Sequence, residues 1–232
     1  MNVEVLADSE ALADRAVELL VAAATAAIEE RGLFVWAVSG GSTPRRMLEL
    51  LSDRDDLDWS RTHLFQVDER VAPDGDSDRN ATMLDSELLT DSFLERHTPA
   101  GIHKMPVTED DLEDASAQYA TLMDAVAGSP VVFDLIQLGM GGDGHTASLI
   151  PDDPILGIHD RDVAMSQQYQ GRIRMSFTWP VLDRARSLLW VIGGESKVGA
   201  VRQFLDNDPA IPATLPTQAR ATILLDEAAN PS

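Results

Sequence analysis

The stretch that most constrains the fold of this chain is residues 133–151, which read FDLIQLGMGGDGHTASLIP. Residues 133–138 form a short, largely apolar run without a turn-forming residue, a pattern typical of a strand that is covered on both faces. Four glycines follow between Gly139 and Gly144. Glycines at this density let the backbone turn sharply and approach a ligand closely. The stretch therefore predicts a buried strand that ends in a ligand-binding loop.

His145 directly follows this glycine-rich loop. Open α/β sheets place their ligand chemistry at the carboxyl ends of the strands, where this histidine is expected. We expect residues 146–149 to form the first turn of a short helix that stops near Pro151. A helix N-terminus disfavours the imidazolium, so His145 would stay neutral and able to accept a proton. The local pattern alone also fits an ordinary loop histidine beside a glycine turn.

The composition excludes several classes of function. The formal net charge of −21 over 232 residues argues against binding to nucleic acid or to an anionic membrane surface. The absence of cysteine excludes disulfides, thiolate chemistry and Cys-ligated metal sites. No run approaches the roughly 20 apolar residues that a membrane span needs, and the N-terminus has no signal-like core. We therefore expect a cytoplasmic protein, in which an anionic substrate would need local positive charge.

Predicted strands alternate with predicted helices along the chain, without a repeat or a linker. A chain of this length can bury the core of one domain. We predict a single α/β domain over residues 1–232, with three α/β/α layers and a Rossmann-like, largely parallel sheet. The expected strands are residues 3–6, 33–38, 62–67, 102–106, 133–138, 162–167, 172–179, 187–192 and 221–225, and the expected helices are residues 9–31, 44–51, 79–89, 109–127 and 195–205.

The segment SGGSTP follows the second strand and offers backbone N–H groups and three hydroxyl groups at the start of a helix. With Thr43 as the cap and Pro44 as the first helical residue, it suits a phosphate, which needs many donors and a positive dipole end. It is neither a Walker A loop nor a G-x-G-x-x-G loop, and a plain strand–helix turn is the alternative. The expected phosphate-binding residues of this segment are Gly40, Gly41, Ser42 and Thr43.

Charged residues follow the third strand. Asp68 and Glu69 are candidates for a general acid or base, and Arg70 for an anion contact, although exposed charge triplets are usually solvated surface. Arg79 and Asn80 begin the next helix and could reach a phosphate or a sugar hydroxyl, although surface helix residues usually do neither. Because parallel strands end at one edge of a sheet, these residues are expected near the SGGSTP segment.

Three more basic residues are candidates for the phosphate site. Arg172 and Arg174 share one face of a predicted strand, and either one pointing into a cleft would be a forked phosphate clamp. Lys197 lies in the first turn of a predicted helix, where the dipole disfavours a cation unless an anion is present. A surface lysine is the alternative. The other histidines show no metal-ligand spacing, so no metal site is predicted.

Taken together, five segments of the chain resemble the 6-phosphogluconolactonase family. This family belongs to a fold group that also includes glucosamine-6-phosphate deaminase and ribose-5-phosphate isomerase. The resemblance runs in order from about residue 5 to residue 225, and its most discriminating part is GDGHTASL with a following proline. The segments are SGGSTP, DER, GMGGDGHTASLIP, RMSFTWPVLDRAR and GGESKVGAV.

The resemblance implies hydrolysis of 6-phospho-D-glucono-1,5-lactone, a sugar-phosphate lactone of the oxidative pentose phosphate pathway, without a metal or an organic cofactor. His145 would be the general base that activates water, and Asp143 would orient the loop or the imidazole. Backbone N–H groups near Gly41, Gly141 and Gly142 would stabilise the developing oxyanion. Arg174, favoured over Arg172 by its spacing to Trp179, would clamp the phosphate together with Lys197. We expect a monomer or a weak homo-oligomer.

Two features depart from the family pattern, and two other functions compete with the lactonase. The acidic loop reads DSDRN where the family often has a Ser-Asn pair, so Arg79 and Asn80 are carried over only weakly. Ile150 stands where the family often has Phe. In glucosamine-6-phosphate deaminases and isomerases, a glutamate at this position works with the histidine, so Ile150 favours hydrolysis. A non-catalytic sugar-phosphate sensor would lack the catalytic histidine, which this chain keeps as His145.

Overall fold

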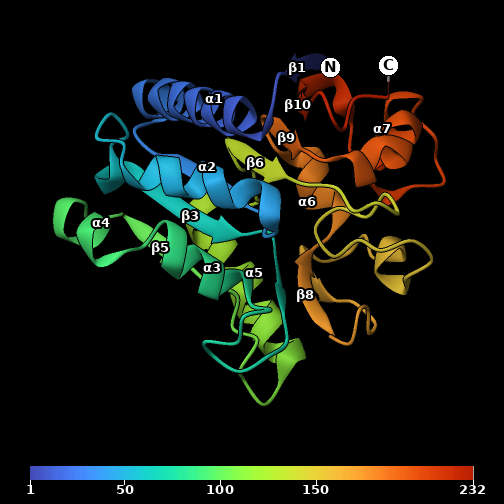
Figure 1. The fold of residues 1–232 in the computed structure, drawn as a ribbon. Coiled ribbons are helices and arrows are strands. Elements are labelled where there is room, and N and C mark those ends of the chain that lie inside the picture. Colours follow the sequence, from blue (N-terminus) through green and yellow to red (C-terminus); the bar gives the residue numbers. More distant parts are fainter. Residues whose placement is uncertain (232) are drawn as a thin grey trace.

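Seven parallel strands form the central sheet of the computed structural model, which describes residues 1–231 (Figure 1). The run 133–138 supplies β6, the middle strand, which pairs with β2 on one side and β9 on the other. Both neighbours are buried along their whole length, as the apolar sequence of these strands predicts. In spatial order the strands are β1 (Asn2–Leu6), β10 (Ala221–Asp226), β9 (Leu188–Ile192), β6 (Leu135–Leu138), β2 (Phe34–Val38), β3 (Thr62–Gln66) and β5 (Gly101–His103).

Helices cover both faces of this sheet, so the predicted three-layer, largely parallel α/β/α arrangement is confirmed. On one face, α1 (Ser9–Arg31) and α2 (Ser42–Ser52) lie side by side and share a hydrophobic core with α3 (Asn80–Glu87) and α4 (Asp91–Arg96) (Figure 1). On the other face, a second core is built on α5 (Leu112–Ala127), α6 (Trp179–Arg184) and α7 (Val198–Leu205). No helix within residues 1–231 combines the length and the apolar character needed to cross a bilayer.

The boundaries of α1 follow directly from the local sequence. Asp8 is the N-cap, and its carboxylate accepts hydrogen bonds from the N–H groups of Glu10 and Ala11 at 3.0 and 2.9 Å. Gly32 ends the helix with φ 82°, a left-handed conformation that favours glycine, and donates its N–H to the carbonyl of Ile28. The short helices α4 and α6 were not predicted, because six residues carry too little periodicity to be recognised.

Three further strands form a separate antiparallel sheet, which the sequence did not predict. Its order is β4 (Asp68–Arg70), β8 (Arg174–Phe177) and β7 (Val163–Met165). The chain leaves the central sheet after β3, and Val67 marks the transition. Its N–H donates to the carbonyl of Val38 in the central sheet, and its own carbonyl accepts the N–H of Phe177 in β8. The DER segment, expected as a strand end, is therefore itself a strand of this small sheet.

Two histidines pair on the edge of the central sheet. His63 of β3 and His103 of β5 have nearly parallel rings, and Nδ1 of His63 lies 3.0 Å from Nε2 of His103. Burial lowers the pKa of His63, and burial together with the neighbouring His63 lowers the pKa of His103 to about 4. No carboxylate within residues 1–231 forms an ion pair with either ring. Both imidazoles are therefore neutral at pH 7. One of the two ring nitrogens in their hydrogen bond carries the proton, and the other accepts it.

This pair predicts a loss of stability on mild acidification. The unfolded chain binds protons at these histidines from about pH 6.5, whereas the folded chain resists them, so stability falls as the pH drops toward 4. Because both rings are partly exposed, we expect a contribution on the order of 1 kcal/mol. Urea unfolding at pH 7.5 and pH 5 measures it. The variant His63→Gln/His103→Gln should show a smaller loss than the parent, whereas His159→Gln, at an exposed position, should show the parental loss.

Candidate active site

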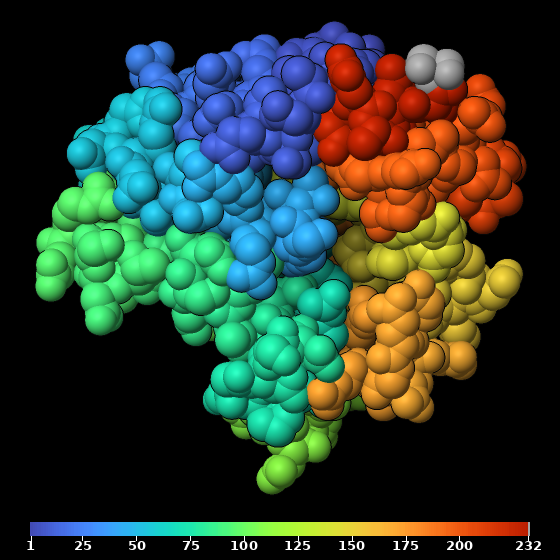
Figure 2. Space-filling model, in the orientation of Figure 1, coloured from blue at the N-terminus to red at the C-terminus, as the bar shows by residue number. Residues whose placement is uncertain are grey.

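A cavity of about 260 Å³ opens where the loops after β2, β3, β6 and β9 meet (Figure 2). Figure 2 shows the surface hollowed between the light-blue end of α2, the teal segment after β3 and the gold segment before β8. The convergence of these strand ends, predicted from the parallel sheet, is confirmed. The cavity is lined by Ser39, Gly40, Gly41, Ser42, Thr43, Pro44, Asp68, Arg70, Asn80, Gly139, Met140, Gly141, His145, Thr146, Ala147, Gln170, Arg174 and Lys197.

The SGGSTP segment forms one wall of the cavity and the first turn of α2. Gly41 is the N-cap of α2, with φ 112°, and no side chain caps the helix. Thr43 is therefore not the cap and Pro44 is not the first helical residue, because α2 begins two residues earlier than predicted, at Ser42. The N–H groups at the start of a helix have no partner within the helix, so those of Ser42 and Thr43 are available to an anion in the cavity.

His145 and Asp143 form a hydrogen-bonded dyad on the opposite wall. Nδ1 of His145 lies 2.6 Å from Oδ1 of Asp143, which also accepts the backbone N–H of His145 at 3.3 Å. The dyad rests against Gly141, where an added Cβ would lie 2.1 Å from Nδ1 of His145. Only glycine fits at this position. With Nδ1 held by Asp143, Nε2 is the ring nitrogen left to accept a proton from a ligand or from water.

The predicted helix at residues 146–149 is wrong. These residues form a tight turn in which Thr146 bridges to Leu149, and Ala147 has φ 51°, a left-handed conformation that a helix excludes. Tertiary hydrogen bonds impose this turn, because Thr146 Oγ1 donates to the carbonyl of Gly139 and Ser148 Oγ donates to Asp68. The helix N-terminus expected directly after His145 is therefore absent, and Asp143 is the residue that holds Nδ1 of the ring.

Three cations line the cavity without a carboxylate partner within residues 1–231. Arg174 is 4% exposed, its Nε has no hydrogen-bond partner in that part of the chain, and its Nη2 reaches only Gln170 at 3.3 Å. Arg70 donates to Asn80 Oδ1 at 2.6 Å and to the carbonyl of Asp78 at 2.9 Å. Lys197, in a short turn before α7, forms no ion pair in the described chain. In a chain of net charge −21, three unneutralised cations in one cavity indicate an anion site.

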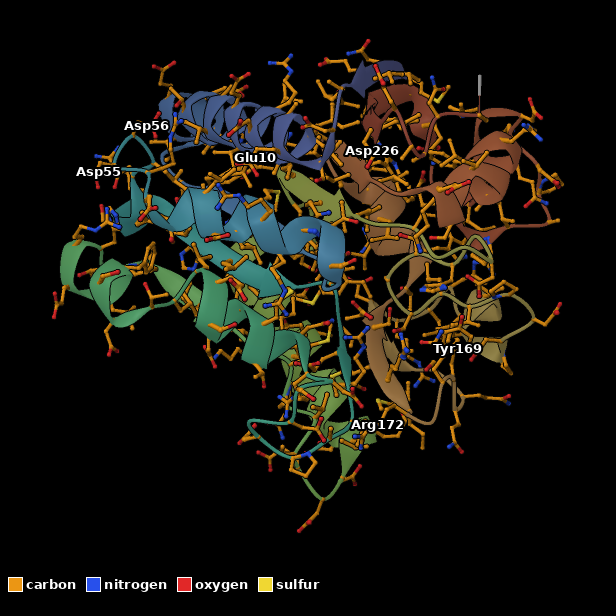
Figure 3. All side chains as sticks on the ribbon, in the orientation of Figure 1. Glu10, Asp55, Asp56, Tyr169, Arg172 and Asp226 are labelled. Carbon is orange, nitrogen blue, oxygen red and sulfur yellow. The ribbon has the colours of Figure 1, made fainter. Side chains whose placement is uncertain are left out.

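The two arginines of the β8 region lie in different surroundings. Arg174 lines the cavity, whereas Arg172 lies in the turn before β8 and pairs with Asp76 at 2.9 Å and Asp78 at 3.0 Å. Figure 3 shows Arg172 at the outer end of this region. The two side chains do not share a strand face as the period of two suggested, because the strand begins only at Arg174.

Asp68 is a buried carboxylate that faces the cavity. It is 4% exposed and accepts hydrogen bonds from Ser148 Oγ at 2.7 Å and from Asn80 Nδ2 at 3.2 Å. The alternative of a solvated charge triplet is wrong for Asp68, because β4 places it inside the molecule. The residue is placed to accept a hydrogen bond from a ligand in the cavity.

Glu69 and Arg79, predicted as a catalytic and a binding residue, do not line the cavity. Glu69 is fully buried, and its oxygens accept the N–H groups of Asn80 and Ala81 at 2.8 Å, at the start of α3. Arg79 is 4% exposed, and its Nε lies 3.0 Å from Oε2 of Glu69. It also donates to the carbonyl of Ala72 at 2.8 Å. The geometry gives these two residues a structural role, in which a buried ion pair anchors α3.

Two of the expected oxyanion contacts are not available as predicted. The N–H of Gly141 donates to the carbonyl of His145 at 2.8 Å, so it cannot also bind a ligand. Gly142 does not line the cavity, and a Cβ added to it would lie 3.1 Å from the carbonyl oxygen of Ser196. The N–H groups of the SGGSTP segment, Gly41 among them, are the donors that remain.

Tyr169 and Gln170 belong to the site but were missed in the sequence. Gln170 lines the cavity beside Arg174, and Tyr169 Oη donates to Oδ2 of Asp143 at 2.8 Å. The four residues 168–171 between two predicted strands include Gly171, which is a signal for a hairpin loop. That signal places the turn but does not say which residue it brings next to Asp143.

Comparisons with known proteins point to one family. Residues 7–225 match the family described as glucosamine-6-phosphate isomerases/6-phosphogluconolactonase. The chain is 37% identical over 207 residues to the 6-phosphogluconolactonase of Synechocystis, covering 88% of this chain and 84% of that protein. It is 32% identical over 246 residues to the 6-phosphogluconolactonase of Streptomyces coelicolor, covering 96% and 90%.

Solved structures show the same fold in two kinds of enzyme. The 6-phosphogluconolactonase of Thermotoga maritima superposes with a TM-score of 0.83 at 24% identity, covering 97% of this chain and 98% of that one. A monomeric glucosamine-6-phosphate deaminase superposes almost as well, with a TM-score of 0.82 at 18% identity, covering 99% and 98%. The fold alone therefore does not distinguish a lactonase from a deaminase.

Proposed function

Because the chain belongs to the glucosamine-6-phosphate isomerase/6-phosphogluconolactonase family, we propose that it hydrolyses 6-phospho-D-glucono-1,5-lactone to 6-phospho-D-gluconate, a step of the oxidative pentose phosphate pathway. The observation that carries this proposal is the set of residues that line, or orient the residues of, the cavity described above. It combines an Asp-oriented histidine with three cations that lack carboxylate partners in residues 1–231. The histidine suits an attack by water, and the cations suit a phosphate.

In the proposed reaction, Nε2 of His145 takes a proton from a water molecule as the water oxygen attacks the C1 carbonyl of the lactone. Asp143 accepts the Nδ1–H and stabilises the imidazolium that forms. The tetrahedral intermediate then collapses, the bond between C1 and the ring oxygen breaks, and the imidazolium returns its proton to that oxygen. No other proton donor is needed, because one base serves both halves of the reaction.

The rest of the cavity holds the substrate. The phosphate binds at the start of α2, where the N–H groups of Ser42 and Thr43 meet the positive end of the helix dipole, and Arg174 and Lys197 neutralise its charge. Asp68 accepts a hydrogen bond from a sugar hydroxyl. Tethering the sugar by its phosphate fixes the carbonyl near His145, which converts binding free energy into a lower barrier.

An amino-sugar phosphate deaminase is the strongest competing function, since it shares the fold. Such an enzyme needs a second acid or base near the histidine to move protons between carbon atoms. Here Ile150 stands where the deaminase pattern has a glutamate, and its side chain is buried and apolar. This observation favours hydrolysis, which needs only one base and a water. The Asp143–His145 contact argues against a non-catalytic sensor, because binding alone does not require an oriented base.

Two assays on the purified chain test the proposal. In the first, freshly generated lactone is consumed and the spontaneous rate is subtracted. In the second, ammonia release from glucosamine 6-phosphate is measured. We expect a large enzyme-dependent rate in the first assay and none in the second. Robust ammonia release, or phosphosugar binding without turnover of either substrate, would overturn the proposal.

Replacing Arg174 should weaken capture of the lactone. The variant Arg174→Ala removes a charge-assisted contact worth about 1.5–3 kcal/mol, so we expect kcat/KM to fall by roughly 10- to 150-fold, mainly through KM. Steady-state kinetics with the lactone measure the change. The matched variant Arg172→Ala, which removes an arginine bound to Asp76 and Asp78, should have a much smaller effect. Equal effects of the two substitutions would contradict the assignment of Arg174 to the phosphate.

The cytoplasmic location and the monomeric or weakly associated state stay predictions of the sequence. Gel filtration with light scattering measures the second of these.

A further inference from the structure

We propose that Tyr169 is a positioning residue, which fixes the orientation of the Asp143–His145 dyad from outside the cavity. The inference rests on the proposed lactonase function and extends it to a residue that does not line the cavity. Tyr169 Oη donates to Oδ2 of Asp143 at 2.8 Å, while the other carboxylate oxygen, Oδ1, lies 2.6 Å from Nδ1 of His145. Both carboxylate oxygens of Asp143 are therefore held, one by Tyr169 and one by His145, and this fixes the orientation of the carboxylate plane.

The backbone around Tyr169 is rigid enough for this role. Tyr169 and Arg172 close a two-residue hairpin with N–H to O=C bonds of 2.9 and 3.2 Å in the two directions. The two central residues, Gln170 and Gly171, have φ of 52° and 83°, as a type I′ turn requires. A glutamine in this conformation is strained, and such strain persists only where the surroundings enforce it. Gln170 is also the residue that contacts Arg174 in the cavity.

The ring of Tyr169 contacts both functional parts of the site. It meets the His145 ring edge-on, with 5.4 Å between centroids, and the guanidinium carbon of Arg174 lies 5.1 Å from its centroid. The aromatic ring thus packs between the base and the phosphate clamp, while the hydroxyl acts on the carboxylate alone. These two contributions are separable, because the hydroxyl donates its hydrogen bond to Asp143 whereas the ring carbons make the aromatic contacts.

The electrostatics are consistent with a tyrosine that donates and an aspartate that stays ionised. Burial opposes ionisation of Asp143, but the Tyr169 hydroxyl and the adjacent His145 outweigh it and lower the pKa of Asp143. Burial and the same hydrogen bond to Asp143 raise the pKa of Tyr169, so its proton stays on the oxygen. With Oδ2 occupied by Tyr169, the carboxylate presents Oδ1 to Nδ1, which keeps the free lone pair of the imidazole on Nε2.

The variant Tyr169→Phe removes the hydroxyl and leaves the ring against His145 and Arg174. Without its second hydrogen bond, Asp143 rotates more freely, and we expect kcat to fall by roughly 5- to 10-fold, which corresponds to about 1–1.4 kcal/mol. We expect KM for the lactone and the melting temperature to stay close to the parental values, since the phosphate contacts and the core are unchanged.

A double-mutant cycle distinguishes positioning from a direct or purely structural role. Asp143→Ala removes the group through which Tyr169 acts, so adding Tyr169→Phe to that variant should cause no further loss of kcat. Multiplicative losses, or an unchanged kcat in Tyr169→Phe alone, would overturn the inference. A parent protein without lactonase activity would instead overturn the proposed function, so the two failures are distinguishable.

The chain supplies a matched control in its other tyrosine. Tyr119 lies 2% exposed in the core, far from the dyad in its contacts, and its hydroxyl bonds to the backbone of Gln66 and His103. Tyr119→Phe removes the same atom and should lower the melting temperature while leaving kcat close to the parental value. Opposite patterns in the two Tyr→Phe variants support the inference, and a loss of kcat with a parallel loss of stability in both contradicts it.

Discussion

The variant His145→Ala should lower the enzyme-dependent rate of lactone hydrolysis by about 10²- to 10⁴-fold, the range that one general base contributes. His145 is the only imidazole that lines the cavity within the described chain, and Asp143 holds its Nδ1 at 2.6 Å. Alanine removes both the proton acceptor of the first step and the proton donor of the second. The phosphate contacts remain, so the product 6-phosphogluconate should still bind.

Two measurements on this variant separate catalysis from binding. Lactone consumption, corrected for spontaneous hydrolysis, gives the rate, and calorimetric titration with 6-phosphogluconate gives the affinity. The control His159→Ala removes an exposed histidine that packs on Trp179, and it should leave the rate unchanged. A full enzyme-dependent rate in His145→Ala would contradict the proposed mechanism. A loss of affinity for the product would indicate that His145 acts in substrate binding and not in the chemical step.

The variant Glu69→Gln should destabilise the protein by about 3–5 kcal/mol, because it breaks a buried ion pair and leaves Arg79 with only the exposed Asp74 as a carboxylate partner. Glu69 is fully buried, and Arg79 opposite it is 4% exposed. Glutamine keeps the shape of the side chain but replaces one acceptor oxygen by an NH₂ group. That group would face N–H donors at the start of α3, where the carboxylate now accepts bonds from Asn80 and Ala81.

Urea unfolding of the parent and the variant at constant pH measures this loss. The control is Glu10→Gln, which breaks the exposed pair with Arg46 and should leave the stability close to that of the parent (Figure 3). The rate per folded molecule tests the competing assignment of Glu69 as a catalytic group. Parental stability with a collapsed rate would restore that assignment and contradict the structural role.

Much of the fold could be predicted because its signals are local. The buried strands β2, β6 and β9 are short apolar runs, and Asp8 and Gly32 mark the ends of α1 by their own chemistry. The convergence of His145, Thr43 and Lys197 on one cavity also follows, because strands of one parallel sheet end at one edge.

What the sequence could not predict depends on contacts between distant residues. The turn at Ala147 is imposed by the bond between Ser148 and Asp68, which are 80 positions apart. Glu69 is buried because β4 pairs with β8, and nothing near Glu69 in the sequence encodes that pairing. Tyr169 reaches Asp143 only through the hairpin that follows β7. In each case the structure depends on a tertiary contact that the local sequence pattern does not encode.

The cavity lies between two separate sheets, and this has a consequence for the ligand-bound protein. The helix α2 and Lys197 follow strands of the large sheet, whereas Asp68, Arg70 and Arg174 belong to the small one. A sugar phosphate that contacts both sides acts as a tie between them, and at 100 times its dissociation constant it adds about 2.7 kcal/mol to the free energy of unfolding. A bound sugar phosphate would thus stabilise the contact between the two sheets, which is also the place where its binding site is formed.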